Sequence, residues 1–218
     1  QPVSEQLREG IVRLSGEHPV NEIWHWGIDA AHFSPAPPER IAALRSRLGF
    51  KDGELMLFSP RATEKLYHHH VLFEAFPAIL KQHPTAKIAL FKTTLEPDYE
   101  KELRATAERL GFAGRVIWMD RLSYADLPVA FSAADALLSI AWTDGTPMTV
   151  LETMACGQPV VGSDIPAVRA LIEDGVNGII VDPWEAPSVA DCVNGLLSMT
   201  ALKRTALGKE ARDFVLRT

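Results

Sequence analysis

A loop near residue 144 and the helix expected after it combine residue types that can bind phosphate and sugar hydroxyls. In the stretch TDGTPMTVLETMACGQPVV, which begins at Thr143, Asp144 precedes a turn and Glu152 follows eight residues later. A carboxylate accepts hydrogen bonds through two oxygens, so it suits the paired hydroxyls of a sugar or a ribose. We interpret both acids as ligands of hydroxyl groups at one crevice. The alternative is that Asp144 is a turn residue and Glu152 a solvated helical residue.

The residues between the two acids predict a helix start that can bind an anion. Thr146 is a candidate cap and Pro147 a candidate first helical residue, so the N–H groups of Met148 and Thr149 would point outward unpaired. Free N–H groups and the positive end of the helix dipole favour a phosphate at such a place. Gly145 carries no side chain, so a ligand can approach the backbone closely. The segment predicts amides for a diphosphate and acids for hydroxyls.

Basic residues that follow another apolar run are candidates for the same phosphate. Arg61 comes directly after Pro60 at the end of that run, and a guanidinium pairs with phosphate oxygens in a bidentate manner. Lys65 is the candidate second cation, and its alternative is an ordinary exposed lysine.

Six short apolar runs, each followed by a helical pattern, must position these residues. The runs are continuous rather than alternating, which is typical of strands buried on both faces of a parallel sheet. The expected strands are 55–59, 87–91, 116–119, 136–140, 159–162 and 178–181. Strand and helix in alternation predict an α/β fold with a doubly wound parallel sheet of about six strands.

Helical periodicity fills the segments between these runs. The expected helices are 70–82, 97–111, 123–134, 147–156 and 187–199, with further helices at 4–14, 39–48 and 202–214 and a short strand at 22–26. Ser123 and Asp126 resemble a capping box with a shorter acid.

The composition predicts one globular domain without a nucleic-acid partner. The chain has 218 residues, 47% of them hydrophobic, and 22 Lys plus Arg against 28 Asp plus Glu. A mild acidic excess gives no electrostatic reason for nucleic-acid binding. Cys156 and Cys192 form neither a disulfide framework nor a zinc-spaced cluster, and no apolar run is long enough to span a bilayer. We expect a cytoplasmic protein.

The chain begins with Gln1, and no signal-peptide pattern follows. We therefore expect residues 1–30 to be a linker from a missing N-terminal domain. Residues 31–218 are then the ligand-binding α/β domain.

The stretch from Thr143 resembles the Glu-x7-Glu region of retaining GT-B glycosyltransferases of family 4, the glycosyl transferases group 1. Asp144 takes the place of the first Glu and is one methylene shorter. Residues in register with the family pattern are Glu152, Met154, Ala155, Cys156, Gly157, Pro159, Val160 and Val161. Further matches are Gly27, Ile28, Asp29, Phe33 and Pro35 after Trp26, which replaces the usual Asn; Glu74, Ala75 and Phe76; and Val176, Asn177, Gly178 and Asp182. The resemblance spans roughly residues 23–195.

The resemblance implies the Rossmann-like, donor-binding half of a GT-B fold and a function. A nucleotide-diphosphate sugar, whether a UDP-, GDP- or ADP-sugar, would give its sugar with retention to an acceptor held by the absent N-terminal domain. No cofactor and no metal are implied. A membrane contact would come from the missing domain, and this chain alone would transfer nothing.

The resemblance also implies roles for single residues. Asp144, Arg61 and Lys65 would serve catalysis, and the donor would contact Gly145, Thr146, Pro147, Met148, Thr149 and Glu152. Arg121 and Leu127 are the candidates that frame the nucleotide base, and the alternative is a plain connection capped by Ser123. Counting back from Glu74 places Tyr67 where the family often has its second cation.

Other functions remain as alternatives. An epimerase of the same architecture and a non-catalytic nucleotide-binding module keep the same features. A dinucleotide-dependent oxidoreductase is disfavoured, because no Gly-x-Gly-x-x-Gly follows any expected strand. Residues 68–70 are three adjacent histidines, which cannot all face one metal ion from a helix or a strand.

Overall fold

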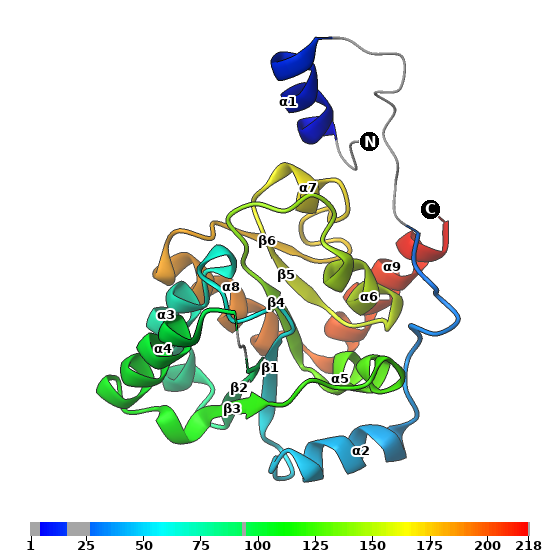
Figure 1. Ribbon diagram of the computed structural model, residues 1–218. Helices are drawn as coiled ribbons and strands as arrows, with labels where there is room; N and C mark the ends of the chain where they lie inside the picture. The colour runs from blue at the N-terminus through cyan, green and yellow to red at the C-terminus, as the bar shows by residue number, and fades with distance from the viewer. Residues whose placement is uncertain (1–4, 17–26, 93–94, 218) are drawn as a thin grey trace.

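A six-stranded parallel sheet forms the centre of the computed structural model, which describes residues 5–16, 27–92 and 95–217 (Figure 1). The strands are β1 (Leu55–Ser59), β2 (Ala86–Phe91), β3 (Val116–Met119), β4 (Ala136–Ser139), β5 (Val160–Ser163) and β6 (Ile179–Val181). Their order is β3-β2-β1-β4-β5-β6, so the direction of winding reverses between β1 and β4. The expected doubly wound, Rossmann-like sheet of six strands is confirmed.

Helices cover both faces of the sheet. They are α2 (Pro38–Arg47), α3 (His69–Gln82), α4 (Pro97–Arg109), α5 (Leu127–Ala133), α6 (Met148–Ala155), α7 (Pro166–Arg169), α8 (Ala186–Ser198) and α9 (Ala201–Arg217). The chain also contains α1 (Glu5–Ser15), which is not among the helices packed in the core. Short 3-10 turns are η1 (Lys65–Tyr67), η2 (Ala113–Arg115) and η3 (Tyr124–Asp126). No helix of the described residues is long and apolar enough to cross a membrane.

Alternation along the strands divides the core into two layers. On β1, Leu57 packs with apolar residues of α3, α4 and α8, whereas Met56 and Phe58 pack with those of α2, α5, α6 and α9. Figure 1 shows α3, α4 and α8 on one side of the sheet and α2, α5, α6 and α9 on the opposite side. Both faces are therefore buried, as the continuous apolar runs require.

Several expected details are wrong. The helix expected at 123–134 is divided into η3 and α5, and Ser123 donates to the Asp126 carboxylate at 2.8 Å rather than capping a backbone amide. Thr146 is not the N-cap residue of α6: Pro147 occupies that position and makes no side-chain cap hydrogen bond. The short helix α7 was not expected. The expected strand at 22–26 and Trp26 lie outside the described residues.

The segment from residue 27 onward is attached to the helical layer formed by α5, α6 and α9. Phe33 is buried, and the Ala36 amide donates to Ser132 Oγ at 3.0 Å. Arg212 of α9 donates to the carbonyls of Phe33 and Ala155. This attachment fixes residues 33–36 against that helical layer.

The close contact between α6 and α9 requires a glycine at position 208, because no Cβ fits there. A Cβ on Gly208, inside α9, would overlap the carbonyl oxygen of Gly157 at the end of α6. The helices could then not remain at their present separation.

We expect Gly208→Ala to lower the free energy of unfolding by about 2 kcal/mol, because overpacking forces the two helices apart. The matched control is Gly195→Ala, since Gly195 also lies inside a helix but has open space around its Cβ position. That change should stabilise the protein by about 0.5–1 kcal/mol. Denaturant unfolding of both variants measures the difference, and equal effects would contradict the packing argument.

Candidate functional site

A cleft of about 650 Å³ lies at the carboxyl ends of the central strands. Its walls come from the loops after β1, β2 and β3 and from α5 and α6. Pro60 and Ala62 follow β1, whereas Thr149 and Glu152 belong to the helix after β4. Because β1 and β4 are adjacent and their following helices cover opposite faces, the cleft occupies the point where the winding reverses. Open α/β sheets bind their ligands at this point.

Arg61 stands between the cleft-lining residues Pro60 and Ala62 without lining the cleft itself, and three side chains hold it. Its Nη2 lies 2.8 Å from Asp144 Oδ2, and its Nη1 donates to Thr149 Oγ1 at 3.1 Å. Its guanidinium also lies over the Tyr67 ring, 4.2 Å from the centroid. The side chains of Arg61 and Asp144 are only 12% and 11% exposed. These contacts give the cation one position in the absence of ligand.

The Arg61–Asp144 pair is close but is not aligned as a hydrogen bond. Among the described residues no hydrogen-bond donor is aligned on Asp144 Oδ2, and this oxygen is buried. At a separation of 2.8 Å the two opposite charges attract each other whatever the orientation of the groups. Asp144 is therefore an ionic partner of Arg61 that retains hydrogen-bonding capacity.

The start of α6 directs amides toward the same place. The Val150 and Leu151 amides donate to the Pro147 carbonyl at 2.9 and 3.3 Å. The Met148 and Thr149 amides come before them, so no earlier helical carbonyl is available to them. Gly145 and Thr146 are half-buried in the preceding loop and Pro147 is buried; none of the three lines the cleft. Met148 and Thr149 are thus the first two residues of the helix, although Thr146 is not its cap; an anion contact with their amides stays a prediction.

Glu152 lines the cleft one helical turn beyond Thr149. Burial raises the pKa of its carboxyl above the ordinary value, and the positive charges of Arg61 and His32 oppose that rise. Asp144 and Glu152 therefore both neighbour Arg61, as expected for two acids at one crevice.

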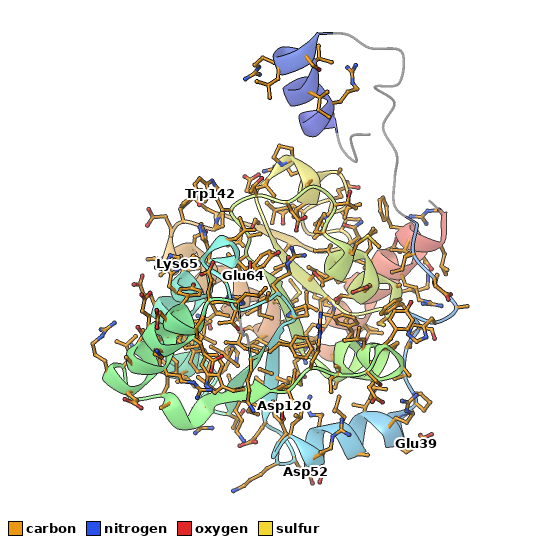
Figure 2. All side chains as sticks on the ribbon, in the orientation of Figure 1. Glu39, Asp52, Glu64, Lys65, Asp120 and Trp142 are labelled. Atoms are coloured by element: carbon orange, nitrogen blue, oxygen red, sulfur yellow. The ribbon has the colours of Figure 1, made fainter. Side chains whose placement is uncertain are left out.

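Lys65 does not line the cleft. On η1, its Nζ lies 3.7 Å from Glu102 Oε2 of α4, and its side chain is 65% exposed. Figure 2 shows Lys65 beside Glu64, above α3 and α4, whereas Asp120 lies near β3 and α2. Tyr67, the other candidate position, contacts Arg61 as an aromatic partner and not as a second cation.

Lys92 is a cleft cation that sequence reasoning missed. It lines the cleft directly after β2, and its Nζ lies 2.7 Å from Asp120 Oδ1. The signal was present, because Lys92 follows an apolar run just as Arg61 does.

The far end of the cleft has an apolar wall and a polar edge. Arg121 and Leu127 both line it, as expected for residues that frame a flat ring. Phe91, Leu95 and Phe131 extend the apolar wall and were not predicted. Contact of Arg121 or Leu127 with a nucleotide base stays a prediction.

The three adjacent histidines have separate partners. His68 donates through Nδ1 to the Pro183 carbonyl at 3.1 Å, His69 is hydrogen-bonded to Ser59 Oγ at 3.1 Å, and His70 contacts the Tyr99 hydroxyl at 3.0 Å. Burial lowers the pKa of His69 to about 3. In the part of the chain that the structure describes, no group of three or more His, Cys, Asp or Glu could hold a metal ion.

A match to a family model shows the protein family of this chain. The model described as Glycosyl transferases group 1 matches residues 41–214, which is most of the chain. The chain belongs to this family. The resemblance inferred from Asp144, Glu152 and the residues after them is confirmed at the level of the family.

Relatives and solved structures agree with the family. A GDP-mannose-dependent monoacylated alpha-(1-6)-phosphatidylinositol monomannoside mannosyltransferase of Corynebacterium glutamicum is 27% identical over 207 residues, covering 92% of this chain and 52% of that protein. HepE of Anabaena, solved with UDP-glucose, superposes with a TM-score of 0.89 at 23% identity, covering 99% of this chain and 58% of that one. The C-terminal domain of a group 1 family protein of Francisella tularensis gives 0.77 at 21% identity, covering 88% and 98%.

The match covers only part of each curated relative. The chain spans about half the length of the curated relatives that it matches. At the identities of the two solved structures, the likeness shows the fold of this group 1 domain.

The raised pKa of Glu152 predicts a pH-dependent difference in stability. A carboxyl whose pKa is higher in the folded state favours folding while it is protonated, and this contribution is lost as pH rises through that pKa. We therefore expect Glu152→Gln to gain stability over the parent chain between about pH 4 and about pH 7. Denaturant unfolding across this range measures it. Glu108→Gln, at an exposed position on α4, is the control, and parallel pH profiles for both variants would refute the burial argument.

Proposed function

We propose that this group 1 domain binds a nucleotide-diphosphate sugar in the cleft at the β1–β4 reversal and presents it for retaining sugar transfer. The observation that carries the proposal is the fixed position of Arg61 beside the start of α6. One preorganised cation and two helix-start amides point at one region, which suits a diphosphate. The family membership of the chain supports a transferase.

Each part of the donor has candidate partners. Glu152 would accept hydrogen bonds from the ribose hydroxyls, and Arg121 with Leu127 would frame the base at the far end of the cleft. Lys92 adds a second positive charge within the cleft, a role that the sequence suggested for Lys65. Asp144 would contact hydroxyls of the sugar while it remains paired with Arg61. A guanidinium has five N–H donors, so Arg61 can contact Asp144 and a phosphate oxygen together.

The proposed chemistry is electrostatic. Breaking the bond between the anomeric carbon and the phosphate oxygen leaves negative charge on the departing nucleoside diphosphate. Arg61 and the Met148 and Thr149 amides would stabilise this charge as it develops, and their fixed positions lower the cost of reorganisation. The residues need no cofactor for this step.

The acceptor and its binding domain are part of the proposal. The relatives are about twice as long as this chain, so we assign the acceptor to a domain outside it. A cytoplasmic location and a membrane contact through that domain stay predictions of the sequence. HepE was solved with UDP-glucose and the mannosyltransferase is named as GDP-mannose-dependent, so UDP-, GDP- and ADP-sugars all remain candidate donors.

The first test is nucleotide binding by calorimetry with UDP, GDP, ADP and NAD. We expect one nucleoside diphosphate to bind, and Arg61→Ala to weaken it about 10- to 100-fold, because a charge-assisted contact is worth about 1.5–3 kcal/mol. Arg61→Lys keeps the charge and should lose less.

Arg109→Ala, at an exposed position on α4, is the matched control and should bind as the parent chain does. Each variant is first checked for a normal unfolding transition, since removing Arg61 leaves the buried Asp144 carboxylate without its partner. Selective binding of NAD, or unchanged affinity in Arg61→Ala, would sink the proposal.

The second test concerns transfer. We expect this chain alone to bind the donor but release no nucleoside diphosphate above the rate without protein, because the acceptor side is supplied from elsewhere. A coupled assay for the released nucleotide measures this. The full-length protein is the positive control, and transfer by the 218-residue chain would contradict the division of labour.

A further inference from the structure

Two exposed tryptophans contact each other in loops that follow strands of the sheet. Trp142 stands in the loop after β4 and Trp184 in the loop after β6, with 59% and 56% of their surfaces exposed. Their ring centroids are 5.6 Å apart, with the planes inclined at 70°. We call this pair, together with the His68 ring that supports it, the indole platform. Figure 2 shows Trp142 at the edge of the molecule, near Lys65.

The platform is held in place by hydrogen bonds from the main chain and from His68. The Trp142 amide donates to the Leu66 carbonyl at 3.0 Å, and the Trp184 amide donates to Asp182 Oδ1 at 2.9 Å. The His68 ring is buried, donates to the Pro183 carbonyl, and lies 4.6 Å from the Trp184 ring. Two large apolar rings are thus fixed toward solvent, where they gain little from burial.

The backbone under the platform is strained. His68 has φ of 47°, and among the described residues it is the one non-glycine with positive φ. Glycine is the usual residue in this conformation, because a Cβ there meets the following carbonyl. Strain of this kind is retained where the side chain has a use, and here the imidazole supports both indoles.

The surroundings of the platform suit a sugar better than an apolar protein surface. Asp182, Glu185 and Thr143 are exposed in the same two loops, so carboxylate and hydroxyl groups border the rings. A pyranose has one face of C–H bonds, which can stack on an indole, and a rim of hydroxyls, which carboxylates can accept. An apolar partner would leave these acids desolvated without partners.

The platform is also connected to the donor site. Trp142 is two residues from Asp144 in the same loop. Tyr67, which lies under Arg61, is the direct neighbour of His68. A ring stacked on the platform would therefore lie next to the reacting end of the donor.

We propose that the indole platform of Trp142, Trp184 and His68 is a subsite that stacks a pyranose ring next to the donor cleft. This proposal rests on the proposed function for its reaction, although its binding test does not need a nucleotide. The ring comes either from the sugar of the donor or from the acceptor, and the same chemistry binds both.

The test is titration of the 218-residue chain with methyl glucoside, methyl mannoside and the matching trisaccharides, followed by saturation-transfer NMR and indole fluorescence. We expect Trp142→Ala and Trp184→Ala each to weaken saccharide binding about tenfold, while Trp142→Phe keeps most of it. The matched control is Leu202→Ala, which removes an apolar side chain that is 81% exposed on α9. It should leave saccharide binding unchanged.

A second variant separates the backbone from the ring. His68→Gly relieves the left-handed conformation but also removes a buried, hydrogen-bonded ring, so we expect it to weaken saccharide binding whichever way the melting temperature moves. A purely structural role for His68 predicts a changed melting temperature with unchanged saccharide binding.

Nucleotide arms identify the source of the ring. If the ring belongs to the donor, a nucleotide sugar binds more tightly than its nucleotide, and Trp142→Ala abolishes that difference. If it belongs to the acceptor, the glycoside still binds when nucleotide is saturating. A chain that binds nucleotide but no saccharide, or a double alanine variant that binds saccharide normally, overturns the platform and leaves the donor site standing. Saccharide binding without any nucleotide binding would overturn the proposed donor site and leave the platform standing.

Discussion

The ion pair between Arg61 and Asp144 is the contact on which the donor site depends. It joins the loops after β1 and β4, the two strands at which the winding of the sheet reverses. Two hydrogen bonds join the same segments, from the Trp142 amide to the Leu66 carbonyl and from Arg61 Nη1 to Thr149 Oγ1. A nearly buried pair is costly to break, since one charge would be left uncompensated. The pair therefore holds the Arg61 guanidinium in one position next to the cleft wall at Pro60 and Ala62.

The two-layer packing of the sheet makes this geometry possible. Met56 and Phe58 belong to one layer and Leu57 to the other, so a slip of β1 by one residue would move each set into the opposite layer, where its packing partners are absent. Arg61 is thereby held in a constant register with the residues after β4. On the other side of the cleft, the close approach of Gly208 and Gly157 fixes α6, whose first turn contributes Thr149 and whose second contributes Glu152.

The sequence predicted the strands well, because buried parallel strands leave continuous apolar runs, and it predicted the acids and amides near α6 from their spacing. It failed where local geometry decided. Pro147 occupies the N-cap position that Thr146 was expected to fill. Lys92 was not predicted, because the family pattern placed the second cation at Lys65 or at the position of Tyr67. The position of Lys65 depends on the turn η1 and on the left-handed conformation of His68, which no periodicity reveals. Wall residues such as Phe131 resemble ordinary core residues until the cleft is seen.

That turn has a consequence for how the site works as a unit. Tyr67 and His68 are adjacent, but the first ring lies against Arg61 and the second lies against Trp184. The left-handed residue changes the direction of the chain between them, so the Tyr67 ring faces Arg61 and the His68 ring faces the two indoles.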